Sequence, residues 1–193
     1  MDSSSFVLRP GGTDVGDAAA LMGALDAAID HLKATGNVDQ WGPTRFSDRN
    51  GYLEAVEESL LEREKYRTTG KGQAKRAVMA EIACTESNGD NVSFRRDAQG
   101  RCWLQVASLE IWENTIGENL TKVDGLRQYI DEAKAQPGGF LFVNSLLADH
   151  RAGDRAKGAG KALMEYAEEH AIKQGMSAVY LDCWIGGTAG LVR

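Results

Sequence analysis

Residues 140–174 read FLFVNSLLADHRAGDRAKGAGKALMEYAEEHAIKQ, and this stretch decides how the fold is interpreted. Its first nine residues form a nearly uninterrupted apolar run, as in a buried strand. After residue 158, apolar residues recur at three- and four-residue steps, which is typical of an amphipathic helix. Gly175 ends that helix, and residues 177–184 have the content of another strand. The stretch therefore predicts a strand, a glycine-bearing turn, a helix and a second strand.

The turn between the first strand and the helix is Asp154-Arg155-Ala156-Lys157-Gly158-Ala159-Gly160-Lys161. From Asp149 to Lys161 four basic and two acidic residues give 4 − 2 = +2, whereas the whole chain carries a net charge of −6. Glycines at a helix start let a ligand approach free backbone N–H groups, and the helix dipole adds partial positive charge there. We therefore expect this turn to bind a phosphate group.

Two common phosphate loops do not match the turn. The Walker pattern GxxxxGK[ST] fails because Arg155 stands at its first glycine and Ala162 follows the lysine. The Rossmann pattern GxGxxG fails because Leu163 occupies the third glycine position and many residues separate the turn from the strand. Leu163 thus also disfavours a nucleotide-binding oxidoreductase.

The hexapeptide Arg155-Ala156-Lys157-Gly158-Ala159-Gly160 resembles, at every constrained position, the [Q/R]xxGx[G/A] turn of the GNAT superfamily of acetyl-CoA-dependent N-acyltransferases. The strand, helix and strand around it are similar to that family's central segment, and the resemblance is strong over residues 140–187. It implies an α/β GNAT-like fold with a mixed, mainly antiparallel sheet flanked by helices, as a single domain over residues 1–193. Residues 68–138 carry no recognisable motif of the family.

The family continues past its last strand into another helix, which often carries a tyrosine acting as general acid, and two more strands. Here the sequence stops at Arg193, and residues 189–193 are similar to the start of that helix. We therefore expect the C-terminal part of the family core to be absent. The alternative to an enzyme is then a catalytically silent acyl-CoA-binding or regulatory module. A shortened sheet exposes edge strands, so we expect the protein to associate with a second copy of itself or with a partner.

The resemblance implies that acetyl-CoA, as co-substrate, lies along the strand before the turn, and that backbone amides of the turn hold its pyrophosphate. A backbone N–H near Leu147 is expected to polarise the thioester carbonyl, as in an oxyanion hole. Which strand residue meets the cofactor stays open. The residues implied are Leu146, Leu147, Ala148, Arg155, Ala156, Lys157, Gly158, Ala159, Gly160 and Lys161.

The resemblance further implies that the primary amine of a small molecule attacks the thioester directly, in a ternary complex. The amine must arrive unprotonated, so a carboxylate has to accept its proton. Glu110, at the end of a strand, and Asp182, on the last strand, are the candidates, and the alternative for each is a structural or surface role. Residues 109–132 carry a net charge of 2 − 6 = −4, which would attract a cationic amine, although a solvated face is the simpler interpretation.

The remaining chain predicts a first strand at residues 6–10, helices over 18–32 and 50–67, strands at 77–84 and 101–111, a third at 92–96, and a short helix within 112–138.

The longest uncharged run, residues 135–148, contains Pro137 and is shorter than the roughly 20 apolar residues of a membrane span. The start Met1-Asp2-Ser3 has no basic, apolar leader, so we expect a cytoplasmic protein. A sequence pI near 5.1 argues against nucleic-acid binding.

The three cysteines are odd in number and far apart in the sequence, which favours reduced thiols. Cys183 alternates with two apolar residues of the last predicted strand, so we expect a buried, inert thiol there. The three histidines form no recognised ligand pair and no CxxC occurs, so no metal site is expected.

Overall fold

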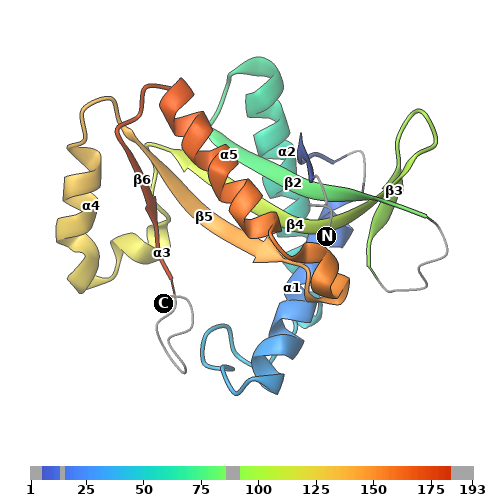
Figure 1. Ribbon diagram of the computed structural model, residues 1–193. Helices are drawn as coiled ribbons and strands as arrows, with labels where there is room; N and C mark the ends of the chain where they lie inside the picture. Colours follow the sequence, from blue (N-terminus) through green and yellow to red (C-terminus); the bar gives the residue numbers. More distant parts are fainter. Residues whose placement is uncertain (1–5, 14–15, 86–91, 184–193) are drawn as a thin grey trace.

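The structure is a computed structural model that describes residues 6–13, 16–85 and 92–183. Its centre is one six-stranded sheet in which β3 pairs with β4 beside the path β1-β2-β4-β5-β6 (Figure 1). Neighbouring strands are antiparallel except β5 and β6, which are parallel. The strands are β1 Val7–Pro10, β2 Lys75–Cys84, β3 Phe94–Arg96, β4 Cys102–Glu113, β5 Phe140–Ala148 and β6 Ala178–Leu181.

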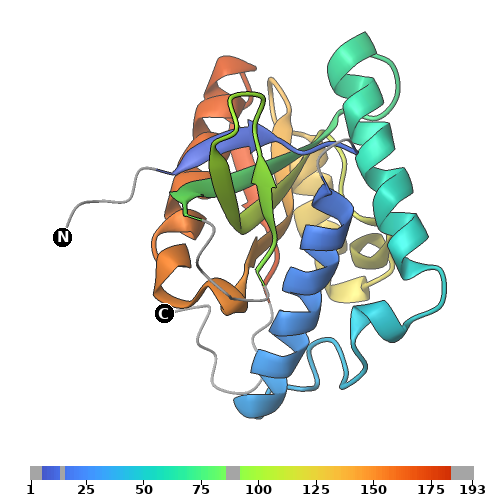
Figure 2. The same ribbon diagram turned by 90° about the vertical axis from the view of Figure 1, so that its right-hand side faces the viewer.

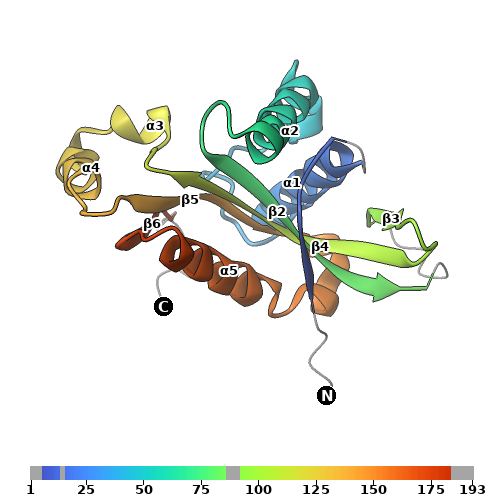
Figure 3. The same cartoon turned by 90° about the horizontal axis from the view of Figure 1, so that it is seen from above.

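Helices cover both faces of the sheet. Figure 3 shows α5 on one face and α1 and α2 on the other, and Figure 2 shows the same arrangement from the side. The helices are α1 Asp17–Ala34, α2 Tyr52–Thr69, α3 Glu118–Thr121, α4 Arg127–Lys134 and α5 Ala159–Lys173. Short 3-10 helices lie at η1 Phe46–Asp48, η2 Asp124–Leu126 and η3 His150–Ala156. None of the described helices is long and apolar enough to cross a membrane.

The main core lies between α5 and the sheet. Every fourth residue of α5 from Ala159 to Ala171 is buried, because this spacing keeps one stripe of the helix against the strands. Alternate residues of β4 and β5 complete the layer, since successive side chains of a strand point to opposite faces. On the other face, Ala24 and Ala28 of α1 pack against Leu147 of β5.

A buried ion network joins β1, α1 and β2. Arg9 donates to both carboxylate oxygens of Asp17 and to Glu81, and both carboxylates are fully buried. Arg95 of β3 completes the network through two further bonds to Glu81. Because each buried charge is paired and hydrogen-bonded, the network fixes the start of α1 against the sheet.

The α/β class and the mixed, mainly antiparallel sheet are confirmed, as are the helices and strands predicted outside residues 112–138. Within 112–138 the structure has α3, η2 and α4 rather than one short helix. The expectation for Cys183 is wrong: β6 ends at Leu181, and Cys183 lies exposed beyond it.

Candidate functional site

The central feature of the site is an open edge on the second half of β5. The strand β6 pairs only with residues 140–143 of β5, whereas β4 pairs along its other side as far as Ala148. The β4–β5 register shifts at this point. Glu110 faces Ser145, whereas the next residue, Ile111, faces Val143. Asn144 is therefore the extra residue of a β-bulge. Among the described residues, no strand pairs with the β6 side of residues 144–148.

The hydrogen bonds of the ladder show which groups point toward this open edge. The amide of Asp149 donates to the carbonyl of Val106 at 2.9 Å, and Ala148 faces Ala107. Ala148 is therefore a non-hydrogen-bonded partner in the antiparallel pair, and because the pattern alternates, Leu146 is one as well. The N–H and C=O groups of Leu146 and Ala148 thus point to the open edge, whereas those of Leu147 point to β4.

The side chains divide in the same way. Leu146 is 44% exposed and Ala148 is also exposed, but Leu147 is only 8% exposed, against α1. Leu147 therefore anchors the strand. The backbone groups of Leu146 and Ala148 are therefore the ones that an extended ligand at this edge could pair with.

The turn after β5 is shaped by one capping side chain and two glycines with positive φ. Asp149 accepts a hydrogen bond from the amide of Arg151 at 3.0 Å and so caps η3. Gly153 then adopts φ 55° and ψ −134°, which breaks the helix, and Gly158 adopts φ 92° just before α5. Positive φ at these positions favours glycine, which has no Cβ to clash.

The N-terminus of α5 offers backbone donors. No side chain caps it, and the first amide to donate is that of Ala162, to the carbonyl of Gly158 at 3.1 Å. Among the described residues, the amides of Ala159, Gly160 and Lys161 have no backbone acceptor. Unpaired N–H groups and the helix dipole together favour an anion at this point.

The turn and the open edge lie beside each other. A Cβ atom at Gly160 would come 3.9 Å from Cδ2 of Leu146, and one at Gly158 would come 3.6 Å from the Phe6 ring. Since Leu146 belongs to the open edge and Gly160 to the first turn of α5, one ligand can touch both.

The basic residues of the turn have mixed roles. Arg151 forms an ion pair with Asp149 at 2.7 Å, and its guanidinium lies over Gly23 of α1, where a Cβ would come within 2.5 Å. Arg155 donates through Nε to the carbonyl of Ala152 at 3.1 Å. Arg151 therefore holds the turn against α1. Its positive charge, which is part of the +2 counted for residues 149–161, is paired with Asp149.

Glu110 lies on the α2 side of β4, next to the bulge. Its Oε1 accepts hydrogen bonds from Arg63 of α2 and from the indole of Trp112, while Oε2 accepts none from the described residues. Burial raises the pKa of nearby Tyr52, and the Glu110 charge raises it further, while the charge of Arg49 acts in the opposite direction. Sequence reasoning missed Arg63, Tyr52 and Trp112, because their approach to Glu110 depends on how α2 packs against the sheet.

Asp182 follows the end of β6 and is exposed. It forms no hydrogen bond or ion pair with any residue that the structure describes. Asp182 would face Asn144 if the parallel register of β5 and β6 continued by one residue. The chain thus places a second carboxylate beyond the last paired residue of β6, where the open edge begins.

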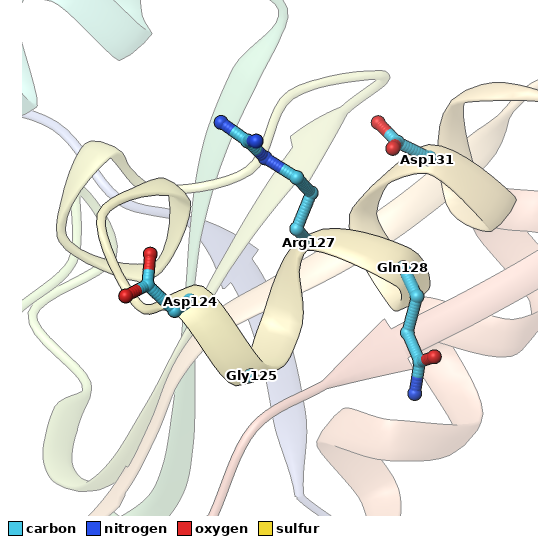
Figure 4. A pocket seen from close by; sticks show the side chains of 5 residues that line it. All are labelled: Asp124, Gly125, Arg127, Gln128 and Asp131. Carbon is cyan, nitrogen blue, oxygen red and sulfur yellow. The ribbon is translucent and has the colours of Figure 1, made fainter.

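A hollow of about 490 Å³ lies elsewhere, on the surface of η2 and α4. Asp124, Gly125, Arg127, Gln128 and Asp131 line it, and Figure 4 shows Gln128 pointing the opposite way from Arg127 and Asp131. The side chains do not converge on one point. The acidic stretch that could have attracted an amine is, in this part, a solvated surface.

No family model and no curated protein matches the chain. Solved structures are similar to it, among them the three that follow. A ribosomal-protein-alanine N-acetyltransferase from Brucella melitensis biovar Abortus 2308 is 13% identical, with a TM-score of 0.46, over 97% of this chain and 86% of that one. A GCN5-related N-acetyltransferase from Ralstonia eutropha JMP134 is 13% identical, with a TM-score of 0.47, over 93% and 84%.

The third structure is AAC(6')-Iy in complex with the bisubstrate analog CoA-S-monomethyl-acetylneamine. It is 9% identical, with a TM-score of 0.45, over 98% of this chain and 86% of that one. The chain is therefore similar, at 9% to 13% identity, to two N-acetyltransferases and to one protein bound to a CoA analog.

Proposed function

We propose that the chain is a GNAT-like N-acetyltransferase, which transfers an acetyl group from acetyl-CoA to the primary amine of a small molecule. One observation carries the proposal: the open β5 edge and the uncapped N-terminus of α5 meet where Leu146 and Gly160 lie beside each other. An acyl-CoA has a peptide-like pantetheine arm and a pyrophosphate, and these two surfaces are complementary to both.

The residues present fit acetyl-CoA. No described strand pairs with the backbone groups of Leu146 and Ala148 that point to the open edge, so the amides of pantetheine could pair with them as an added strand would. The amides of Ala159, Gly160 and Lys161 are placed to hold the pyrophosphate, and the exposed Lys157 adds positive charge. Gly160 lets the phosphates come close, because a side chain at this position would occupy the space next to Leu146.

The chemistry follows from the same positions. Acetyl-CoA supplies an acetyl group activated as a thioester. A backbone N–H at the open edge, from Leu146 or Ala148, is the donor that polarises its carbonyl. Glu110 accepts a proton from the attacking amine through Oε2, directly or through water, and Asp182 is the second candidate for this role. Since Glu110 faces α2, the amine would approach from the α1 and α2 side of the sheet.

A second candidate function is a catalytically silent acyl-CoA-binding module. The observation that favours it is the ion pair between Glu110 and Arg63, which gives the carboxylate a structural role without any catalysis. Both candidates need the same cofactor site, and they differ only in turnover.

The experiment that separates the two is release of CoA thiol from acetyl-CoA, measured with a panel of small primary amines. Because the exposed Cys183 would add a background signal with a thiol reagent, the assay uses the Cys183→Ser chain and a blank without amine. Amine-dependent release above the blank supports the enzyme. Binding of acetyl-CoA with no release for any amine supports the silent module.

A further inference from the structure

Two of the three cysteines meet at one end of the sheet. Cys84 is the last residue of β2, Cys102 is the first of β4, and the two are direct partners in the antiparallel ladder. Their Sγ atoms lie 2.7 Å apart, and both thiols are free and partly buried. Cysteines that are distant in the sequence are thus adjacent in the fold.

The ladder defines the geometry of this pair. The amide of Gln105 donates to the carbonyl of Ser93 at 3.1 Å, so it points toward β3 and away from β2. Amide directions alternate along a strand, so the amide of Cys102 points toward β2, and Cys84 and Cys102 form a hydrogen-bonded pair. In such pairs the Cα atoms are about 5.5 Å apart, within the range of about 4.4–6.8 Å found for disulfides.

The Cβ atoms of directly opposed residues are about 4.5–5.5 Å apart and closest in non-hydrogen-bonded pairs, whereas a disulfide prefers about 3.5–4.5 Å. Joining the two sulfurs therefore needs a small adjustment. Cys84 and Cys102 stand at strand ends, where an adjustment disturbs few ladder bonds.

The surroundings of the pair are partly apolar and carry nearby positive charge. The Cys84 side chain packs against the core between α5 and the sheet. Burial and the neighbouring Cys102 thiol raise the pKa of Cys84 to about 11, although the charges of Arg155 and Arg96 act in the opposite direction. Cys84 is therefore protonated at neutral pH and reacts slowly with single-site alkylating reagents.

We propose that Cys84 and Cys102 are a redox-active dithiol that small disulfides, such as oxidised glutathione, convert into a reversible disulfide between β2 and β4. One thiol loses its proton to solvent, and its sulfur attacks a glutathione sulfur, which releases one glutathione thiolate and leaves a mixed disulfide. The second thiol loses its proton and attacks the bound sulfur, which releases the second glutathione. The protein loses two electrons and two protons, and one oxidised glutathione becomes two reduced ones. The proposal does not depend on acetyl transfer.

The test uses the full chain in buffers with different ratios of reduced to oxidised glutathione. After acid quenching and unfolding, free thiols are counted and the peptides are mapped. The oxidised wild type, which has three cysteines, is expected to give a peptide that links Cys84 to Cys102, while the exposed Cys183 stays free or carries glutathione. Cys183→Ser is expected to fall from two thiols to none, and Cys84→Ser to show no linked peptide.

Three results would overturn the proposal: three persistent thiols in the oxidised wild type, a stable glutathione adduct on Cys84 or Cys102 without the link, or a link to Cys183. Thermal unfolding gives a measurement that needs no substitution at either cysteine. Closing the loop from Cys84 to Cys102 should raise the Tm of the oxidised wild type by roughly 5–10 °C, reversibly on reduction.

Discussion

Arg63 of α2 and Glu110 of β4 form an ion pair that joins the helix to the sheet, and Arg63 is 8% exposed. The guanidinium also donates to Ser59, while its buried Nε atom has no hydrogen-bond partner in the part of the chain that the structure describes. Because Glu110 satisfies most of this buried charge, we expect a strong dependence of each residue on the other.

Arg63→Met should lower the free energy of unfolding by about 3–5 kcal/mol, because it leaves the Glu110 charge with no cationic partner. The double variant Arg63→Met with Glu110→Leu should recover most of this loss, since two apolar side chains replace two charges. Urea unfolding of the wild type, both single variants and the double variant forms a complete cycle. Additive losses in the double variant would show that the two residues are not coupled.

The role of Glu110 as a general base can be tested by substituting it and, as a control, a second glutamate of β4. Glu110→Gln should lower kcat by about 10²–10⁴-fold, the usual contribution of a general base, while the Kd of acetyl-CoA stays unchanged. Glu113→Gln is the matched control, because Glu113 is also on β4 but binds Arg76 of β2 and His170 of α5. Assays run below the Tm of each variant. An equal loss of kcat in both variants would remove Glu110 from the proposed mechanism.

The stacked rings of His31 and His150, with centroids 3.9 Å apart, predict a pH dependence of stability. Burial lowers the pKa of His150, and the charge of His31 lowers it further, while Asp149 acts in the opposite direction. The unfolded chain therefore binds this proton more tightly than the folded chain. Stability should fall as the pH drops through about 6.5 toward the lower folded pKa.

The measurement for this pair is the Tm between pH 7.5 and 5. The wild type should lose more stability over this range than His150→Gln, which cannot bind the proton. The same slope in both chains would mean that other groups account for the acid sensitivity.

Asp97 predicts a second acid-sensitive contact, in the β3–β4 hairpin. The indole of Trp103, at 2.9 Å, is the main cause that lowers the pKa of Asp97, and the amides of Arg101 and Gln99 also donate to it. Because the folded pKa is depressed, this stabilisation is present above about pH 3.9 and is lost as the pH falls toward the folded pKa.

Asp97→Asn should therefore lower the Tm at pH 7, and the difference from wild type should shrink in acid. Asp124→Asn, at the exposed hollow in Figure 4, is the control and should change little at either pH. A constant difference between Asp97→Asn and wild type from pH 7 to pH 2 would show that the charge of Asp97 is unimportant.

Local patterns were sufficient to predict most of the elements. The four-residue spacing from Ala159 to Ala171 identifies α5 and its buried stripe, and the glycines before it identify the turn. These features depend on neighbouring residues, so they are visible in the sequence. The region of α3 and α4 was harder, because its two helices have only four and eight residues and a short 3-10 helix lies between them.

Features that depend on strand pairing were not visible. The backbone direction of Leu146 and Ala148 follows from the register with β4, and the open edge follows from the short pairing with β6. The ion pair of Arg63 with Glu110 and the meeting of Cys84 with Cys102 both join distant segments. The sequence therefore predicted the candidate cofactor turn more completely than the groups around Glu110.

The measurement that tests the central claim most directly is calorimetric titration of acetyl-CoA into wild type and Gly160→Glu. The substitution should be tolerated by the fold, since a Cβ at Gly160 meets Leu146 only at 3.9 Å and a carboxylate suits the first turn of a helix. It should nevertheless repel and obstruct the pyrophosphate. Gly125→Glu is the control, because nothing lies within 4 Å of a Cβ there.

We expect wild type and Gly125→Glu to bind acetyl-CoA equally well. Gly160→Glu should bind at least about tenfold more weakly, or about 1.4 kcal/mol less favourably, with an unchanged Tm. Equal affinity in all three chains, or no binding by the wild type, would contradict the assignment of the β5 edge and the α5 turn as an acyl-CoA site.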